Sequence, residues 1–264
     1  MAWRLPPIRL PRPLLRATYN IYERQLLREI ASDRVPTHVG FIMDGNRRHA
    51  KAKGRLPWEG HRLGSDTVEA LVEWGREIGV RTMTLYAFST ENFGRPDQEV
   101  ETLMDLFAHR LADLAADNRI LDNGVRVRVL GRTEMLPPDV LDAIRLVEGV
   151  TAKFDSYCLN FCIAYGGRQE IIDAVKKLID KVETGELDRD AIDEEVLAAH
   201  LYTGGDDPEL IIRTGGESRL SNFLLYQAAY SELFFTDVYF PSFRKIDFLR
   251  VIRDYQRRQR RFGR

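Results

Sequence analysis

Short apolar runs recur along the chain, and longer segments with a helical spacing of apolar residues lie between them. Most runs end at small or polar residues, a pattern typical of strands that are buried on both faces. Between the runs, apolar residues recur every three or four positions, which indicates amphipathic helices. Strands are predicted within residues 38–43, 83–88, 125–131, 158–167, 209–216 and 233–240. Helices are predicted within residues 14–30, 66–79, 100–118, 137–150, 170–182, 193–202 and 246–261.

Strands that alternate with helices predict an α/β fold, in which helices flank a central, mostly parallel sheet of six strands. No internal repeat and no glycine- or serine-rich linker divides the chain. Four prolines within residues 4–13 argue against a helix there. We therefore expect an N-terminal segment, residues 1–34, followed by a single domain, residues 35–264.

Composition narrows the class of protein. The chain has 264 residues, of which 44% are hydrophobic and 30% charged, the profile of a globular protein. Its net charge of −1 does not indicate a nucleic-acid binder. Two cysteines exclude a disulfide scaffold and fit a reducing compartment. No apolar stretch nears the roughly 18 residues of a membrane span, and no secretory signal is recognisable, so we expect a cytoplasmic protein.

The charge is unevenly distributed. Residues 1–34 carry a net charge of +4 and residues 244–264 one of +7, which leaves −12 for the middle of the chain. Such an asymmetry suggests an interaction role for the two ends. The predicted helix within residues 14–30 is amphipathic and could lie on a membrane, on a partner or on its own domain. Peripheral contact with the inner face of a membrane therefore stays open.

The polar residues that follow the first strand have the make-up of an anion site. In open parallel sheets, ligands bind beyond the carboxyl ends of the strands. Asp44 ends the first strand, and Gly45, Asn46, Arg47 and Arg48 would open a helix. Backbone N–H groups at a helix start, a glycine and two guanidinium groups suit a phosphate or diphosphate. Asp44 beside that anion is a candidate Mg²⁺ ligand, with a helix N-cap as the alternative.

A second loop of similar make-up follows the fifth strand. Arg213 and Arg219 flank a glycine pair, and Ser221 offers a hydroxyl. The chain has no P-loop, dinucleotide-binding, zinc-protease or nucleophile-elbow motif. Two diphosphate-sized sites, one metal carboxylate and no evident nucleophile predict an enzyme that joins two diphosphate substrates.

Several long motifs, in order, resemble those of a known family. The matching stretches are HVGFIMDGNRRHAKAKG, LYAFSTENFGRP, IAYGGRQEI, IIRTGGESRLSNFLLYQAAYSELFFTDVYFP and the C-terminal RRFGR. Over residues 37–264 the chain resembles the cis-prenyltransferases of the undecaprenyl or dehydrodolichyl diphosphate synthase type. The resemblance implies a homodimer with the fold described above.

The resemblance also implies an activity. These enzymes condense isopentenyl diphosphate repeatedly with an allylic diphosphate, here farnesyl or geranylgeranyl diphosphate, and use Mg²⁺. The expected product is a long-chain Z-polyprenyl diphosphate for a lipid carrier of glycosyl groups. Two alternatives stay open: a short-chain or non-standard cis-prenyltransferase, and a subunit of a two-protein synthase.

Carried over motif by motif, the resemblance assigns roles to individual residues. The catalytic residues are Asp44, Asn46, Ser89 and Asn92. Substrate-binding residues are Gly45, Arg47, Arg48, His61, Phe93, Arg95, Arg213, Arg219, Ser221 and Gly263. The metal carboxylates are Asp44 and Glu232. Glu99 shares a loop with Phe93 and Arg95 that closes over the substrate, and Gly263 belongs to a motif that reaches the partner subunit's site.

The growing prenyl chain needs an apolar chamber that excludes water. Candidate lining residues, for which ordinary core packing is the alternative, are Leu71, Val72, Trp74, Leu103, Leu106, Phe107 and Leu111. The stretch between Glu99 and Val125 is two residues longer than the bacterial pattern, which favours a long product. Pro57 and Ser218 stand where other members of the family have an Arg and a His, so a diphosphate contact and a metal contact of the family are in question.

Overall fold

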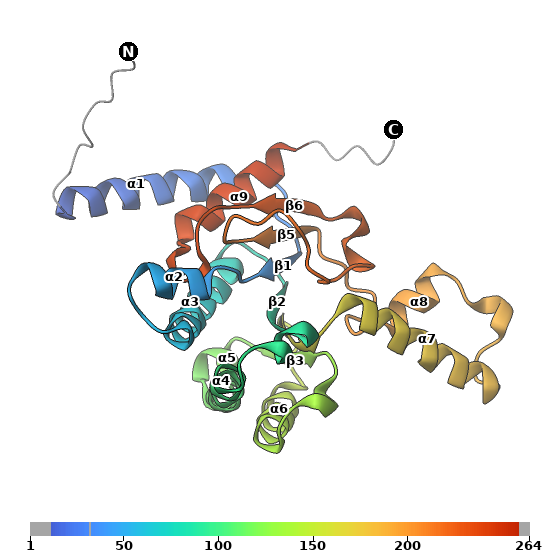
Figure 1. The fold of residues 1–264 in the computed structure, drawn as a ribbon. Helices are drawn as coiled ribbons and strands as arrows, with labels where there is room; N and C mark the ends of the chain where they lie inside the picture. The colour runs from blue at the N-terminus through green and yellow to red at the C-terminus, as the bar shows by residue number, and fades with distance from the viewer. Residues whose placement is uncertain (1–11, 32, 259–264) are drawn as a thin grey trace, which may run out of the picture. The chain divides into compact units, whose positions relative to one another are not determined.

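A parallel sheet of six strands forms the centre of the unit that spans residues 36–243 (Figure 1). The computed structural model describes residues 12–31 and 33–258. The strands are β1 (His38–Ile42), β2 (Thr82–Ser89), β3 (Val125–Leu130), β4 (Tyr157–Tyr165), β5 (Leu210–Arg213) and β6 (Glu232–Phe235). Their order in the sheet is β3-β4-β2-β1-β5-β6. The six strands and the α/β class predicted from the sequence are confirmed.

The strand order places a topological switch beside β1. The chain passes from β1 to its neighbour β2, continues to the β3 side, and returns across β1 to β5. Ile42 at the end of β1 is in register with Tyr86 of β2 and with Arg213 of β5. Because all the pairs are parallel, the loops that follow β1, β2 and β5 leave from the same edge of the sheet. Such a switch point is where ligands bind in folds of this class.

The strands form because the core covers both of their faces. All five residues of β1 are buried, and a Cβ on Gly40 would lie only 3.1 Å from Ile211. On one face, Phe41 packs edge-on against Phe240 and Phe243. On the other face, Ile42 joins an apolar cluster that includes Phe223. The loop after β5 is thereby fixed against the sheet.

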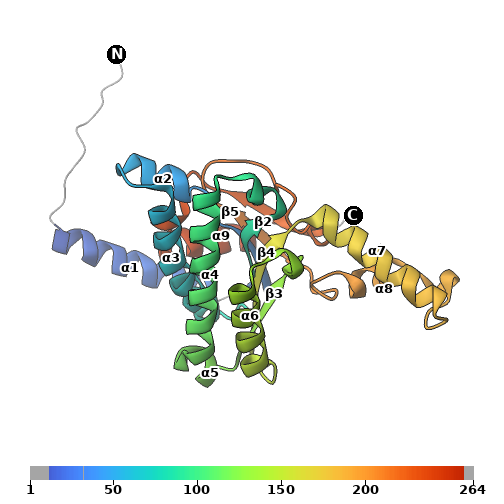
Figure 2. The same ribbon diagram turned by 60° about the horizontal axis from the view of Figure 1, so that its bottom comes forward.

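Seven α-helices are described in this unit. They are α2 (Asn46–Ala52), α3 (Pro57–Glu77), α4 (Asp97–Ala116), α5 (Asn118–Asp122), α6 (Pro138–Thr151), α7 (Gly167–Glu183) and α8 (Glu194–His200). Helices α3, α4 and α6 run alongside one another (Figure 2). The predicted start of α3 at residue 66 is wrong. The helix begins at Pro57, where proline suits the first position, and Glu59 accepts a hydrogen bond from the Leu56 N–H at 2.9 Å.

The second unit comprises residues 1–35 and 244–264. Its two described helices, α1 (Arg12–Ile30) and α9 (Lys245–Arg257), pack on each other. The Arg250 guanidinium lies 5.0 Å from the ring centre of Tyr22, and Lys245 pairs with Glu23 at 2.7 Å. The N-terminal helix therefore packs on α9, a segment of the domain predicted for residues 35–264. No described helix is long and apolar enough to cross a membrane.

Candidate active site

The turn after β1 depends on a glycine. Gly45 has a φ of 101°, a left-handed conformation that favours glycine. A Cβ at this position would also lie 2.7 Å from the ring of Tyr239. Helix α2 begins directly afterwards, at Asn46. The turn thus presents the side chain of Asp44 and the first N–H groups of α2 at the same edge of the sheet.

Asp44 is held by arginines from two elements. Arg213 at the end of β5 donates from Nη2 to Oδ2 at 2.9 Å, and Arg48 of α2 lies with Nη2 3.0 Å from Oδ1. Burial acts to raise the pKa of Asp44, but the hydrogen bonds from Arg213 and Arg48 outweigh it and hold the pKa below its usual value. The carboxylate is not the N-cap of α2, because the cap is Gly45 and has no side-chain cap bond.

The loop after β5 is organised around Arg213. Its side chain is 5% exposed, donates from Nη1 to the Ser221 hydroxyl at 2.7 Å, and also donates to the carbonyl of Arg219. Its buried Nε–H has no hydrogen-bond partner among the described residues. Glu217 links the two anion loops, with Arg48 at 3.4 Å and Arg219 at 2.6 Å. Arg213, Arg219 and Ser221, predicted as one site, therefore lie together and beside Asp44.

A second basic cluster converges on Glu99, which is only 4% exposed. Its Oε1 lies 3.1 Å from Arg95 Nη1, 3.3 Å from His61 Nε2 and 3.6 Å from Arg47 Nε. These groups come from the start of α2, from α3 and from the segment between β2 and α4. Burial, together with the charge of Arg95, lowers the pKa of His61 against the opposing effect of Glu99. The cluster thus gathers three basic side chains around one carboxylate, that of Glu99.

The turn after β2 faces the loop after β5. Ser89 ends β2 and Asn92 lies in the turn, and the Ser89 N–H donates to Asn92 Oδ1 at 3.1 Å. Glu91 accepts a hydrogen bond from Asn222 Nδ2 at 2.9 Å, which ties the turn to that loop. Phe93 packs edge-on against Phe88 of β2, with ring centres 4.9 Å apart. Ser89 and Asn92, two of the four predicted catalytic residues, therefore lie at the switch-point edge, where a hydrogen bond between them shapes the turn.

Asn46 joins the anion site to an apolar cavity. Its Nδ2 donates to the carbonyl of Met43 at 3.1 Å, while its buried Oδ1 has no partner among the described residues. Helix α3 approaches this side chain closely, since a Cβ on Gly64 would lie 2.5 Å from Asn46 Oδ1. Both Asn46 and His61 line the cavity.

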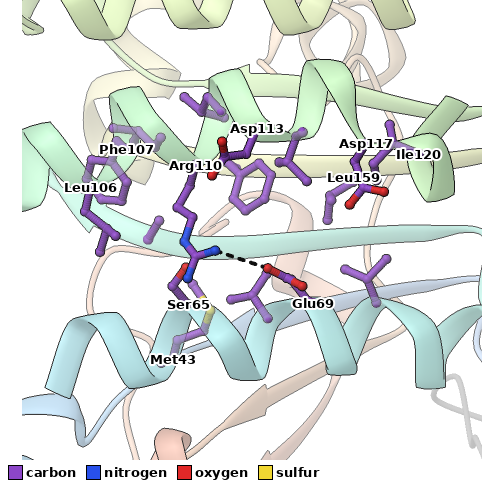
Figure 3. Close-up of a pocket in the computed structure, with 18 of the residues that line it drawn as sticks. Met43, Ser65, Glu69, Leu106, Phe107, Arg110, Asp113, Asp117, Ile120 and Leu159 are labelled. Atoms are coloured by element: carbon purple, nitrogen blue, oxygen red, sulfur yellow. Dashed lines mark hydrogen bonds and ion pairs between the residues drawn. The ribbon is translucent and has the colours of Figure 1, made fainter. Parts of the chain in front are cut away.

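The cavity lies between α3, α4 and the sheet (Figure 3). The predicted lining residues that do line it are Val72, Leu103, Leu106, Phe107 and Leu111. Leu71 and Trp74 are not among its lining residues, and Leu71 is fully buried in the core. The sheet contributes Leu159, Phe161 and Ile163. An apolar chain attached to an anion at Asn46 would therefore find an apolar chamber directly beside it.

Glu232 is not brought to Asp44 within one chain. It is the first residue of β6 and is in register with Leu210, whereas Asp44 lies beyond the opposite end of β1 and contacts Arg213. Strands rise about 3.3 Å per residue, so the level of Glu232 is roughly 10 Å from that of Arg213. The two predicted metal carboxylates therefore stand at different levels of the sheet within one chain. Gly263 lies outside the described residues.

The residues around Asp44 suit a metal ion that is also bound by the phosphate oxygens of a substrate. Among the described residues no three His, Cys, Asp or Glu side chains gather as a metal site. Magnesium commonly binds through one or two carboxylates together with substrate phosphate oxygens. Asp44 is partly exposed and, with about four acceptor positions on a carboxylate, retains capacity beyond its arginine contacts. Asp44 is thus a suitable single protein ligand.

Sequence reasoning missed several residues that build the site. Thr214 donates from its hydroxyl to the carbonyl of Asp44 at 2.8 Å, and Tyr239 lies under the Arg48 guanidinium at 5.5 Å. Gly60 and Gly64 allow α3 to approach Asn46. Of these four residues, only the two glycines could have been found from the sequence. Two glycines four residues apart on a helix share one face and permit close packing.

Known proteins resemble this chain over nearly its whole length. The model of a family described as putative undecaprenyl diphosphate synthase matches residues 42–263. A tritrans,polycis-undecaprenyl-diphosphate synthase of Pyrococcus abyssi, described as geranylgeranyl-diphosphate specific, is 54% identical and covers 97% of each chain. An isoprenyl transferase of Thermus thermophilus is 50% identical over 95% of this chain and 97% of its own.

Solved structures agree with these matches. The crystal structure of lavandulyl diphosphate synthase from Lavandula x intermedia, in complex with dimethylallyl diphosphate, has a TM-score of 0.83 and 34% identity to this chain. The match covers 87% of this chain and 99% of that one. The chain therefore belongs to the undecaprenyl diphosphate synthase family of cis-prenyltransferases, enzymes that extend prenyl diphosphates.

Proposed function

We propose that the protein is a Mg²⁺-dependent synthase that condenses isopentenyl diphosphate with geranylgeranyl diphosphate and makes a long-chain Z-polyprenyl diphosphate for lipid carriers of glycosyl groups. The observation that carries the proposal is the adjacency of two basic loops, joined through the ion pair of Asp44 with Arg213, at one edge of an apolar cavity. The choice of primer rests on the name of the Pyrococcus relative, which specifies geranylgeranyl diphosphate.

The allylic diphosphate would bind at the start of α2. Arg48, the backbone of Gly45 and the basic cluster of Arg47, His61 and Arg95 surround that position. Glu99 already neutralises part of that cluster, so it keeps the three side chains gathered before substrate arrives. The prenyl tail would extend from there past Asn46 into the cavity.

Isopentenyl diphosphate would bind at the loop after β5. Arg213 is buried, and its Nε–H has no hydrogen-bond partner within residues 12–31 and 33–258. Ser221 offers a hydroxyl, and Arg219 is exposed beside them. Asp44 fixes the guanidinium of Arg213 in place, so little reorganisation is needed when the diphosphate binds. The Oδ1 of Asn46, to which no group in the described part of the chain donates, is an acceptor at the junction of the two subsites.

The reaction follows from this arrangement. The bond from C1 of the primer to its diphosphate oxygen breaks, C1 bonds to C4 of isopentenyl diphosphate, and a proton leaves C2 of that unit. Arginines preorganised around the leaving diphosphate stabilise the charge that develops on it. Magnesium bound beside Asp44 would supply further neutralisation of that charge. The apolar cavity excludes water, which would otherwise capture the allylic cation.

A homodimer is the assembly we infer. Ile172, Val175 and Ile179 form an apolar row on α7, and each is at least 40% exposed. Residues at these spacings share one helix face, as expected for a surface that a second copy covers. If Glu232 takes part in Mg²⁺ binding, as we propose, it would then have to act at the site of the other subunit. We also propose peripheral contact with a membrane, and the reason is that the proposed product is a lipid.

Competition between primers tests the proposal. The purified chain is incubated with isopentenyl diphosphate, Mg²⁺ and an equimolar mixture of unlabelled farnesyl diphosphate and deuterium-labelled geranylgeranyl diphosphate, so that the label in each product, read by mass spectrometry, identifies its primer. We expect polyprenyl diphosphates that start from the longer primer, and loss of product when the metal is chelated. Products built on farnesyl diphosphate alone would refute the assigned primer, and product formation with the metal removed would refute the role of Mg²⁺.

A further inference from the structure

The segment that carries Ser221 has an unusual backbone. Ser221, Asn222 and Leu224 have φ values of 52°, 65° and 43°, in the left-handed region that residues other than glycine rarely adopt. Among them, asparagine suits this region best, because its short polar side chain can hydrogen-bond locally. Such residues persist only where the surrounding structure holds them, and they cluster at functional sites. The contacts that hold this segment therefore bear on the site.

Asn222 attaches the segment to the start of α7. Its carbonyl accepts a hydrogen bond from the Gly167 N–H at 2.7 Å, and its Oδ1 accepts one from the Arg168 N–H at 2.9 Å. Its Nδ2 donates to Gln169 Oε1 at 3.2 Å. A Cβ on Gly166 would lie 2.8 Å from Nδ2, so this glycine leaves room for the amide. Two N–H groups that have no acceptor within the helix are thereby satisfied.

The same amide reaches the turn after β2. Nδ2 of Asn222 also donates to Glu91 Oε1 at 2.9 Å. Burial acts to raise the pKa of Glu91, but hydrogen bonds from its own backbone N–H and from Ser89 and Asn222 outweigh it and hold the pKa below its usual value. The carboxylate is therefore charged at neutral pH, and hydrogen bonds to charged groups are among the stronger ones. Glu91 thus joins the predicted catalytic serine to the segment of Ser221.

Two tyrosines fix the backbone on either side of Asn222. Tyr86 of β2 donates to the carbonyl of Ser221 at 3.2 Å. Tyr165, at the end of β4, accepts a hydrogen bond from the Leu224 N–H at 3.2 Å. These bonds hold the path of the chain, whereas the amide of Asn222 sets where the segment stands relative to the turn after β2.

We propose that Asn222 is a positioning residue for isopentenyl diphosphate, which acts through Glu91 to hold the loop after β5 in register with the end of β2. A diphosphate bound at Ser221 is thereby held next to Ser89. The inference rests on the proposed binding of isopentenyl diphosphate at this loop. No hydrogen bond within residues 12–31 and 33–258 joins Asn222 to the primer subsite at the start of α2. The two substrates should therefore respond differently when the bond to Glu91 is broken.

A pair of variants tests this role by reversing the bond. Asn222→Asp keeps the Oδ1 acceptor and tolerates the left-handed backbone, and the Gln169 amide can turn to donate to it. Facing Glu91, however, it replaces a hydrogen bond with repulsion between two carboxylates. Glu91→Gln, added to Asn222→Asp, supplies an amide donor and restores the bond with its direction reversed.

The KM for isopentenyl diphosphate is the readout. Asn222→Asp should raise it about three- to tenfold, the range that one hydrogen bond contributes, and should leave the KM for geranylgeranyl diphosphate within about twofold. Adding Glu91→Gln should bring it back to within about twofold of the unmodified chain. Asn222→Gly suits the backbone but lacks the side chain, so it should raise this KM and gain nothing from Glu91→Gln.

A binding measurement removes the dependence on turnover. Isopentenyl diphosphate is titrated calorimetrically into each variant with Mg²⁺ and an unreactive thiolo analogue of geranylgeranyl diphosphate in the primer subsite. The dissociation constants should follow the same ranking as the KM values. Melting temperatures identify any variant that fails by unfolding.

Two matched variants control for the changes of charge. Asn123→Asp removes the exposed amide that donates to the Arg119 carbonyl at 2.6 Å at the end of α5. Asp142→Asn breaks an exposed ion pair with Arg145 on α6. Both should leave the KM for isopentenyl diphosphate unchanged.

The outcomes are distinct. A KM for isopentenyl diphosphate that stays within about twofold in both Asn222 variants overturns the role, as does an equal rise for both substrates or in Asn123→Asp. Failure of Glu91→Gln to rescue Asn222→Asp overturns the coupling through Glu91. If Asn222→Asp does not fold, Asn222→Gly decides alone. Absence of condensation by the unmodified chain would instead overturn the proposed function on which the inference rests.

Discussion

At the scale of single residues, the site is built from acidic side chains that hold basic ones in place. Asp44 pairs with Arg213 and Arg48, and Glu99 gathers Arg47, His61 and Arg95. Without these carboxylates the basic groups would repel one another and relax apart. Each acidic residue therefore preorganises an anion site, even though its own negative charge repels the anion. A metal ion bound at Asp44 would turn that repulsion of the diphosphate into attraction.

Replacing Asp44 tests this arrangement. Asp44→Asn removes the charge that fixes Arg213 and leaves only neutral ligand atoms beside the diphosphate. We expect kcat/KM to fall by about 10²- to 10³-fold, the cost of losing one preorganised electrostatic group. Steady-state incorporation of labelled isopentenyl diphosphate measures it, with Asp142→Asn as the matched exposed control. A loss below tenfold would contradict the role given to Asp44.

His61 makes a second prediction, on pH dependence. Burial and the charge of Arg95 lower its pKa below the usual 6.5, so below that pH the folded state binds fewer protons than the unfolded one. Stability contributed by His61 is therefore complete above pH 6.5 and is lost as the pH falls toward the lowered pKa. Urea unfolding at pH 7.5 and 5.5 should show a steeper loss for the unmodified chain than for His61→Gln. Equal losses would exclude a lowered pKa of His61.

At the scale of elements, glycines decide how closely the site-bearing segments approach. Gly45 permits the turn into α2, and Gly60 and Gly64 allow α3 to pack on Asn46. A Cβ on Gly60 would lie 2.2 Å from the Asn46 carbonyl oxygen, which ordinary packing does not permit. The catalytic candidate Asn46 can therefore occupy its position only because Gly60 and Gly64 have no side chains.

Alanine at Gly45 should therefore be costly. The left-handed backbone strains a residue with a Cβ by about 1–2 kcal/mol, and the contact with Tyr239 adds to that. We expect a lower melting temperature together with a loss of kcat/KM. Gly149→Ala, at an exposed position in α6 with nothing within 4 Å, should instead stabilise the helix by about 0.5–1 kcal/mol. Equal melting temperatures for the two variants would contradict the proposed strain.

At the scale of the whole molecule, the sequence predicted the strands well because strands buried on both faces are continuous apolar runs. It also grouped Asp44 with Arg213, because the carboxyl ends of parallel strands share an edge. The order of the strands and the pairing of α1 with α9 depend on contacts between distant segments, which periodicity does not report. Glu232 was grouped with Asp44 by motif alone, although the predicted strand within residues 233–240 already placed it at a strand start, and the register shows the level that it occupies.

The central claim is that the loops after β1 and β5 hold two diphosphates for one condensation. The most direct measurement is a single-turnover reaction of the purified chain with Mg²⁺, geranylgeranyl diphosphate and isopentenyl diphosphate, with the first product analysed by NMR. The account predicts a prenyl diphosphate longer by one C5 unit, with a new Z double bond and one diphosphate released. Diphosphate release without carbon–carbon bond formation, or a new E double bond, would contradict it.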